Sequence, residues 1–104
     1  MTADIRARVQ EVLPGLRKEL EDLVRIESVS ADPARLGEVE KSARMTADLF
    51  AAEGVDVDIV RAFDGGPPAV VGEKKGPEGA PRVLLYAHHD VQPENDHADW
   101  DSPP

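Results

Sequence analysis

The chain has 104 residues, which is enough for one small domain and too few for two. Its 21 acidic and 12 basic residues give a net charge of −9, which argues against a nucleic-acid partner because a negative surface repels the phosphate backbone. The absence of cysteine excludes disulfides, thiol catalysis and thiolate metal sites, so a metal ion would need histidine and carboxylate ligands.

The first predicted element is an amphipathic helix. Apolar residues between Ile5 and Val24 recur every three or four positions, the spacing that places them on one face of a helix. Pro14 lies inside this segment and lacks a backbone donor. We therefore expect either a kink at Pro14 or two helices that meet there, with Pro14 in the first turn of the second.

A second amphipathic helix is predicted over about 35–53. Its apolar residues run from Leu36 to Phe50 with the same spacing. The pattern stops at Gly54, which is placed where a helix commonly ends in a left-handed cap.

About three strands are predicted after the helices. In residues 55–59 Val and Ile alternate with Asp56 and Asp58, as in a strand whose aspartates face solvent. A short strand over 69–73 follows a turn rich in Gly and Pro. Residues 82–87 are a continuous apolar run typical of a strand covered on both faces.

The remaining residues, 91–104, have no usable periodicity and are predicted to form a loop. We expect His97 to be an exposed residue of this loop. Trp100 is a large ring close to the third strand, and it either lines a substrate pocket or packs within the loop. Because the third strand would still lack cover, we expect the chain to be truncated.

The chemistry is expected at the carboxyl end of the third strand, where open α/β sheets usually bind ligands. Alternation along an extended chain points His88 and Asp90 to the same side and His89 away from them. A neutral imidazole binds zinc, and a carboxylate on its other ring nitrogen selects the tautomer. We therefore predict His88 as a metal ligand and Asp90 as its catalytic partner, whereas His89 packs or faces solvent and its replacement by Phe should be nearly silent.

Residues 83–93 read VLLYAHHDVQP and residues 100–104 read WDSPP, which resembles the first metal motif of zinc metallopeptidase family twenty. That family includes dipeptidases, glutamate carboxypeptidases, aminoacylases and amino-acid deacylases. Its pattern is an apolar strand, a small residue, His, any residue, Asp, Val, and Pro two positions later. Residues 23–30, LVRIESVS, also resemble the family's beginning, so the similarity covers nearly the whole chain.

The resemblance implies a dinuclear zinc site in which His88 binds one ion and Asp90 orients that histidine. The family's other ligands, including a bridging Asp and a Glu-Glu pair whose first member is the general base, lie beyond this motif. The predicted domain is therefore residues 1–104 as the incomplete N-terminal part of an α/β metallopeptidase catalytic domain. We expect the parent to be active and this chain to be inactive.

The expected reaction is hydrolysis of a small peptide, because the VQP sequence after Asp90 is more typical of the dipeptidases than of the deacylases. The alternatives are an N-acyl amino-acid deacylase of the same family and a non-catalytic fragment. Non-haem iron oxygenases also use a His and a nearby carboxylate, but on a β-barrel rather than a helix-rich chain. No run approaches the roughly 20 apolar residues of a membrane span, and residues 1–8 lack the apolar core of a signal peptide. We therefore expect a cytoplasmic protein with no membrane partner, and a homodimer is possible for the parent.

Overall fold

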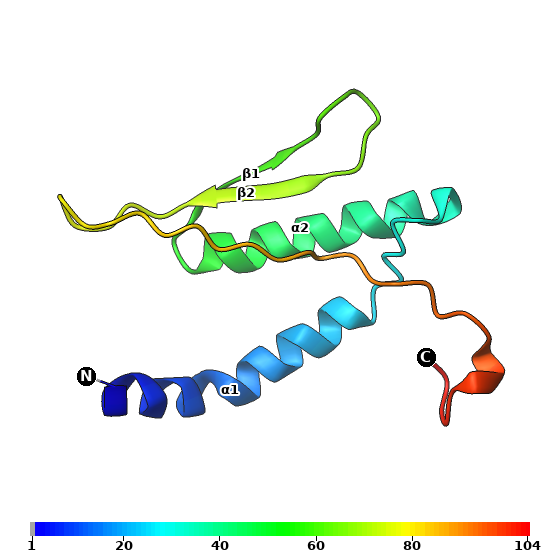
Figure 1. The fold of residues 1–104 in the computed structure, drawn as a ribbon, viewed down its shortest axis with the longest axis horizontal. Coiled ribbons are helices and arrows are strands. Elements are labelled where there is room, and N and C mark those ends of the chain that lie inside the picture. Colours follow the sequence, from blue (N-terminus) through cyan, green and yellow to red (C-terminus); the bar gives the residue numbers. More distant parts are fainter. Residues whose placement is uncertain (1) are drawn as a thin grey trace.

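The fold is mixed α/β, with two helices followed by a two-stranded antiparallel sheet (Figure 1). It is described by a computed structural model that covers residues 2–104. The helices are α1 (Thr2–Val24) and α2 (Leu36–Ala52), the strands are β1 (Asp56–Val60) and β2 (Ala69–Glu73), and two single-turn 3-10 helices are η1 (Pro33–Arg35) and η2 (His97–Asp99).

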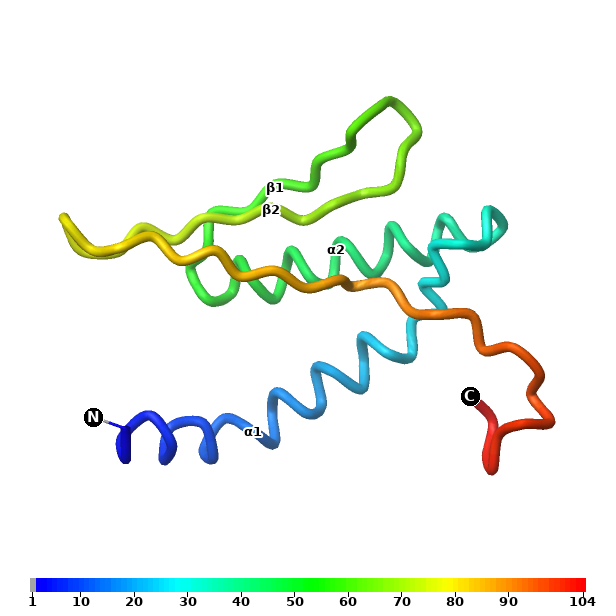
Figure 2. The backbone as a smooth tube through the Cα atoms, viewed as in Figure 1, coloured from blue at the N-terminus to red at the C-terminus, as the bar shows by residue number. Residues whose placement is uncertain are grey.

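Helix α1 is continuous and contains Pro14, so the prediction of two separate helices is excluded. The helix axis changes direction near its middle, as Figure 2 shows, which agrees with the alternative of a kink. None of its described residues is buried, and Leu16 and Leu20 of its apolar face are exposed. No helix within residues 2–104 is long and apolar enough to cross a membrane.

Helix α2 carries the small core of the chain. Its residues Val39 and Ala43 are buried together with Ile26 and Val29 of the segment that follows α1. The helix packs against the β1–β2 hairpin, and Figure 1 shows the two lying alongside each other. The prediction of this helix is confirmed, and Gly54 after it has a φ of 75°, the left-handed conformation expected of a glycine cap.

The hairpin confirms the first two predicted strands. Asp56 pairs with Glu73 at one end of the ladder and Val60 pairs with Ala69 at the other. Asp56 and Asp58 are exposed, as the alternation predicts, whereas Val57 and Ile59 are partly covered.

The prediction of a third, buried strand is wrong for this chain. Residues 82–87 are extended but form no strand in the described structure. Val83, Leu84, Leu85 and Tyr86 are 74%, 91%, 88% and 91% exposed. An apolar run becomes a buried strand only where neighbouring strands accept its backbone hydrogen bonds and other layers cover its two faces. Within residues 2–104 no element provides this for residues 83–86, which cross in front of α2 in Figure 1.

Candidate functional site

The structure brings the two predicted site residues, His88 and Asp90, into direct contact. His88 Nδ1 lies 2.9 Å from Asp90 Oδ1 and 3.0 Å from the Asp90 carbonyl oxygen. Both of these oxygen atoms can only accept a hydrogen bond, so Nδ1 carries the proton and donates it. The second ring nitrogen, Nε2, then has a free lone pair on a side chain that is 67% exposed. This arrangement offers one imidazole nitrogen to a ligand from solvent.

Asp90 is held on its other oxygen by Ser30. The Ser30 hydroxyl donates a hydrogen bond to Asp90 Oδ2, and the two residues are 60 positions apart in the sequence. This hydrogen bond, followed by the one from His88, holds the pKa of the Asp90 carboxyl below its usual range, although partial burial acts in the opposite direction. Asp90 is therefore an ionised acceptor at neutral pH, with one oxygen on Ser30 and the other on His88.

The backbone beside Ser30 attaches the same loop to the core. The Val91 amide donates a hydrogen bond of 3.0 Å to the Ser28 carbonyl oxygen, and Val29 and Val91 form an isolated parallel bridge. Val29 is buried at 3% exposure. The segment 28–30 therefore binds the site loop through a side chain and the backbone.

His89, between the two site residues, is directed at other partners. The hydroxyl of Ser42 on α2 donates to the His89 carbonyl oxygen at 2.8 Å, and the same Oγ lies 3.1 Å from His89 Nδ1. His89 Nε2 lies 3.3 Å from the Pro68 carbonyl oxygen. The prediction that His89 packs instead of joining His88 and Asp90 agrees with these contacts.

A bidentate ion pair holds the loop that follows the site. Arg35 donates from Nη1 to Glu94 Oε2 at 2.9 Å and from Nη2 to Glu94 Oε1 at 2.6 Å. Chiefly because of Arg35, the pKa of Glu94 falls from 4.5 to about 2. His97 Nε2 lies 3.7 Å from Glu94 Oε1, and its side chain is 66% exposed, as predicted. The residue begins the 3-10 helix η2, which the prediction of a plain loop over 91–104 did not include.

Trp100 both packs within the loop and lines a hollow. Its indole Nε1 donates to the Glu94 carbonyl oxygen at 2.8 Å. The ring also borders an open cavity of about 470 Å³ together with Val24, Arg35 and Pro93. His88 and Asp90 are not among the residues that line this cavity. The cavity is therefore a feature of the loop and of the end of α1, separate from the His88–Asp90 pair.

The pair can supply one ligand and its orienting carboxylate to a metal ion. Within residues 2–104 there is no group of three or more His, Cys, Asp or Glu side chains placed to hold a metal. Zinc sites in proteins normally use three or four protein ligands. In the described part of the chain, His88 and Asp90 thus fit a zinc ion as part of a site.

Ser30 and Ser42 are the residues of this region that the sequence did not predict. Ser30 belongs to the LVRIESVS stretch, whose resemblance to the start of the peptidase family gives this serine no role of its own. Ser42 is a small polar residue on the buried face of α2, a position that offers no chemical signal by itself.

No family model matches the sequence, and no solved structure matches the fold.

Proposed function

We propose that the chain is the N-terminal part of a metal-dependent hydrolase of small peptides, with His88 as a zinc ligand and Asp90 as the carboxylate that orients it. One observation carries the proposal: the 2.9 Å contact between His88 Nδ1 and Asp90 Oδ1 leaves Nε2 free on an exposed ring. Carboxylate–histidine pairs of this kind are the usual outer support of zinc-binding imidazoles.

The residues of the chain have separate roles in this proposal. Asp90 selects the His88 tautomer and increases the basicity of Nε2. Ser30 fixes the carboxylate of Asp90 and favours its ionised form. When bound, a pair of zinc ions would supply Lewis acidity and a water of lowered pKa, the requirements for cleaving an amide near neutral pH.

A complete site requires further ligands in addition to His88. The uncovered apolar residues 83–86 support the view that residues 1–104 are part of a larger catalytic domain, because a run of this kind is normally covered on both faces. We expect the 104-residue chain to have no peptidase activity and to bind zinc weakly. The parent would act in the cytoplasm.

A dipeptide-like substrate is favoured over an N-acyl amino acid by the VQP sequence after Asp90. A second candidate function is non-catalytic. The exposed residues 83–86 would allow the chain to associate through an unpaired extended segment. Zinc binding at His88 distinguishes the two, because association through 83–86 does not require it.

The proposal is tested by titrating zinc into the chain while the ring signals of His88 are followed by NMR. We expect zinc to shift the His88 signals, and His88→Ala to abolish this binding. Asp90→Asn should weaken binding by about 10- to 100-fold, the usual loss for an outer-shell partner. His97→Ala is the matched control, because His97 is equally exposed and lies outside the pair. Unchanged zinc binding in His88→Ala would refute the assignment.

A further inference from the structure

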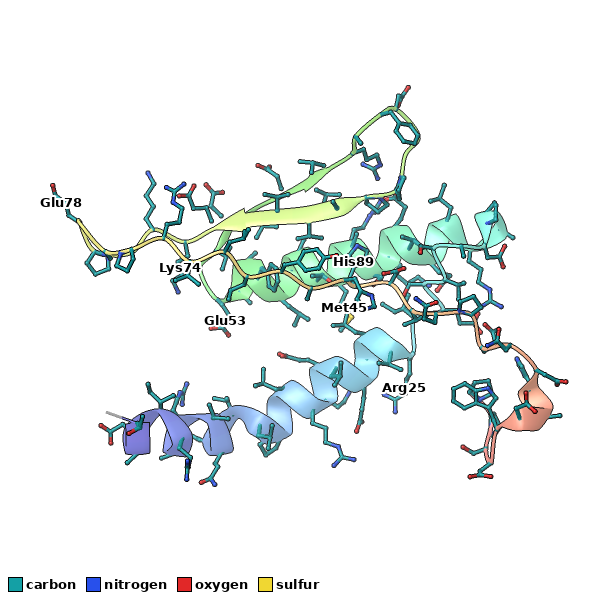
Figure 3. The ribbon with its side chains drawn as sticks, viewed as in Figure 1. Arg25, Met45, Glu53, Lys74, Glu78 and His89 are labelled. Carbon is teal, nitrogen blue, oxygen red and sulfur yellow. The ribbon has the colours of Figure 1, made fainter. Side chains whose placement is uncertain are left out.

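The side chain of His89, between the two site residues, is held more firmly than that of His88. His89 has contacts at its carbonyl oxygen and at both ring nitrogens, whereas the His88 side chain is 67% exposed. The partners of His89 come from two elements: Ser42 lies on α2 and Pro68 immediately precedes β2. Figure 3 shows His89 in front of α2, where the extended segment crosses that helix.

Ser42 is suited to fix a position because it has little freedom to move. It is fully buried, at 0% exposure, between the core residues Val39 and Ala43 of α2. Its Oγ lies within hydrogen-bond distance of both the carbonyl oxygen and Nδ1 of His89. Because the single hydroxyl proton goes to the carbonyl oxygen, the neutral His89 ring donates from Nδ1 to Oγ, and its Nε2 then contacts the Pro68 carbonyl oxygen without a second hydrogen bond. One hydroxyl thus holds the main chain and the side chain of His89 at the same time.

This attachment determines which way the neighbouring side chains point. In an extended chain, consecutive side chains project to opposite sides. Because the His89 ring is directed at Ser42 and Pro68, His88 and Asp90 are turned together to the other side, where they meet at 2.9 Å. If the extended chain turned over, His89 would be exposed and the pair would face α2.

We propose that His89 is a positioning residue, which acts through Ser42 and packs against the Pro68 carbonyl oxygen, and so holds His88 and Asp90 in register on the exposed side of the loop. The meaning of this role for zinc rests on the proposed function. The role itself is a property of the metal-free chain. It revises the expectation that replacing His89 by Phe is nearly silent, since Phe keeps the backbone carbonyl contact with Ser42 but makes neither of the two ring-nitrogen contacts.

The test reads the tautomer of His88 from the ¹⁵N signals of its ring, in the zinc-free chain at about pH 8, where an ordinary imidazole is neutral. In the wild type we expect the proton on Nδ1, because Nδ1 donates to Asp90. In His89→Phe and in Ser42→Ala we expect both tautomers to be populated. His97→Phe is the matched control and should keep the wild-type tautomer.

Two further measurements separate positioning from a general loss of structure. Variants are compared only where the amide signals of α2 show that the helix is intact, and Ser42→Ala supports the test if His89→Phe does not fold. His89→Gln, whose amide can donate and accept, should recover part of the Nδ1–H tautomer. A purely structural role would lower the melting temperature without changing the tautomer of the folded chain.

Zinc titration of the same variants links the inference to the proposed function. We expect the dissociation constant at His88 to rise by about 10-fold in His89→Phe, the lower end of the range for outer-shell changes. If zinc does not shift the His88 signals of the wild type, the proposed function is refuted. The role of His89 would still be decided by the tautomer of His88 in the zinc-free variants. A folded His89→Phe and a folded Ser42→Ala that both keep the wild-type tautomer would overturn the inference.

Discussion

Removal of the Ser30 hydroxyl tests whether its hydrogen bond to Asp90 stabilises the candidate site. In Ser30→Ala, Asp90 loses the partner of its Oδ2 atom and keeps only His88 on Oδ1. A hydrogen bond to a charged group contributes about 1.5 to 3 kcal/mol net to stability. Ser30 is exposed, so water can partly replace its hydroxyl, and we expect a loss of about 1.5 kcal/mol at neutral pH.

The loss should depend on pH in a defined direction. The folded-state pKa of Asp90 lies below the ordinary value of 3.8, with the Ser30 hydrogen bond as the largest cause. The stabilisation is therefore fully present above 3.8 and disappears as the pH falls through the lower folded-state pKa. Ser30→Ala and the wild type should consequently differ in stability at neutral pH and converge in acid.

Urea denaturation at a series of pH values measures the free energy of unfolding, and NMR of the Asp90 carboxyl carbon measures its pKa. In Ser30→Ala the pKa of Asp90 should move up toward 3.8. Ser30→Thr is the matched control because it keeps a hydroxyl at the same position. A stability difference that is the same at every pH, or a threonine variant as defective as the alanine one, would contradict this account of Asp90.

Two further predictions concern the parts of the chain that flank the site. Glu94→Gln should release the loop that contains Trp100, seen as a change in tryptophan fluorescence. In the wild type the same release should occur only in strong acid, because the stabilisation from Glu94 is present above 4.5 and lost as the pH falls through about 2. Gly72→Ala should destabilise the hairpin by about 1 to 3 kcal/mol, because the added Cβ would lie 2.7 Å from Val55 Cγ1. Faster amide hydrogen exchange in β1 and β2 would detect it, and unchanged exchange would show that the strands accommodate the methyl group.

The elements that the sequence predicted well are those determined by local pattern. Helix α2 and the β1–β2 hairpin follow from the spacing of apolar residues and from glycine and proline at the turns. The prediction of the third strand was wrong because a strand forms only where neighbouring strands pair with it, and the sequence pattern does not show whether they are present. Residues 83–86 have the composition of a buried strand, yet burial requires other segments to cover them, and in the described residues they remain 74% to 91% exposed.

The same distinction applies to the site. His88 and Asp90 are two positions apart, so the alternation of an extended chain was sufficient to predict that they face the same way. The hydrogen bonds from Ser30 and Ser42 could not be predicted in this way, because Ser30 is 60 positions from Asp90 and Ser42 is 47 positions from His89. Contacts over such separations are produced by the tertiary fold, and serine has too many ordinary roles to mark them.

The chain changes within a few residues from an exposed segment, 83–86, to the well-attached residues of the candidate site. Residues 83–86 are largely exposed, whereas His89 and Asp90 contact three separate parts of the fold: segment 28–30, α2 and the turn before β2. Segments with few buried contacts open easily, and those tied to the core resist opening. The geometry of His88 and Asp90 therefore depends on contacts already present within residues 28–91 and not on the cover that 83–86 lacks. Any element that later paired with 83–86 would meet a segment in which the direction of His88 and Asp90 is already set.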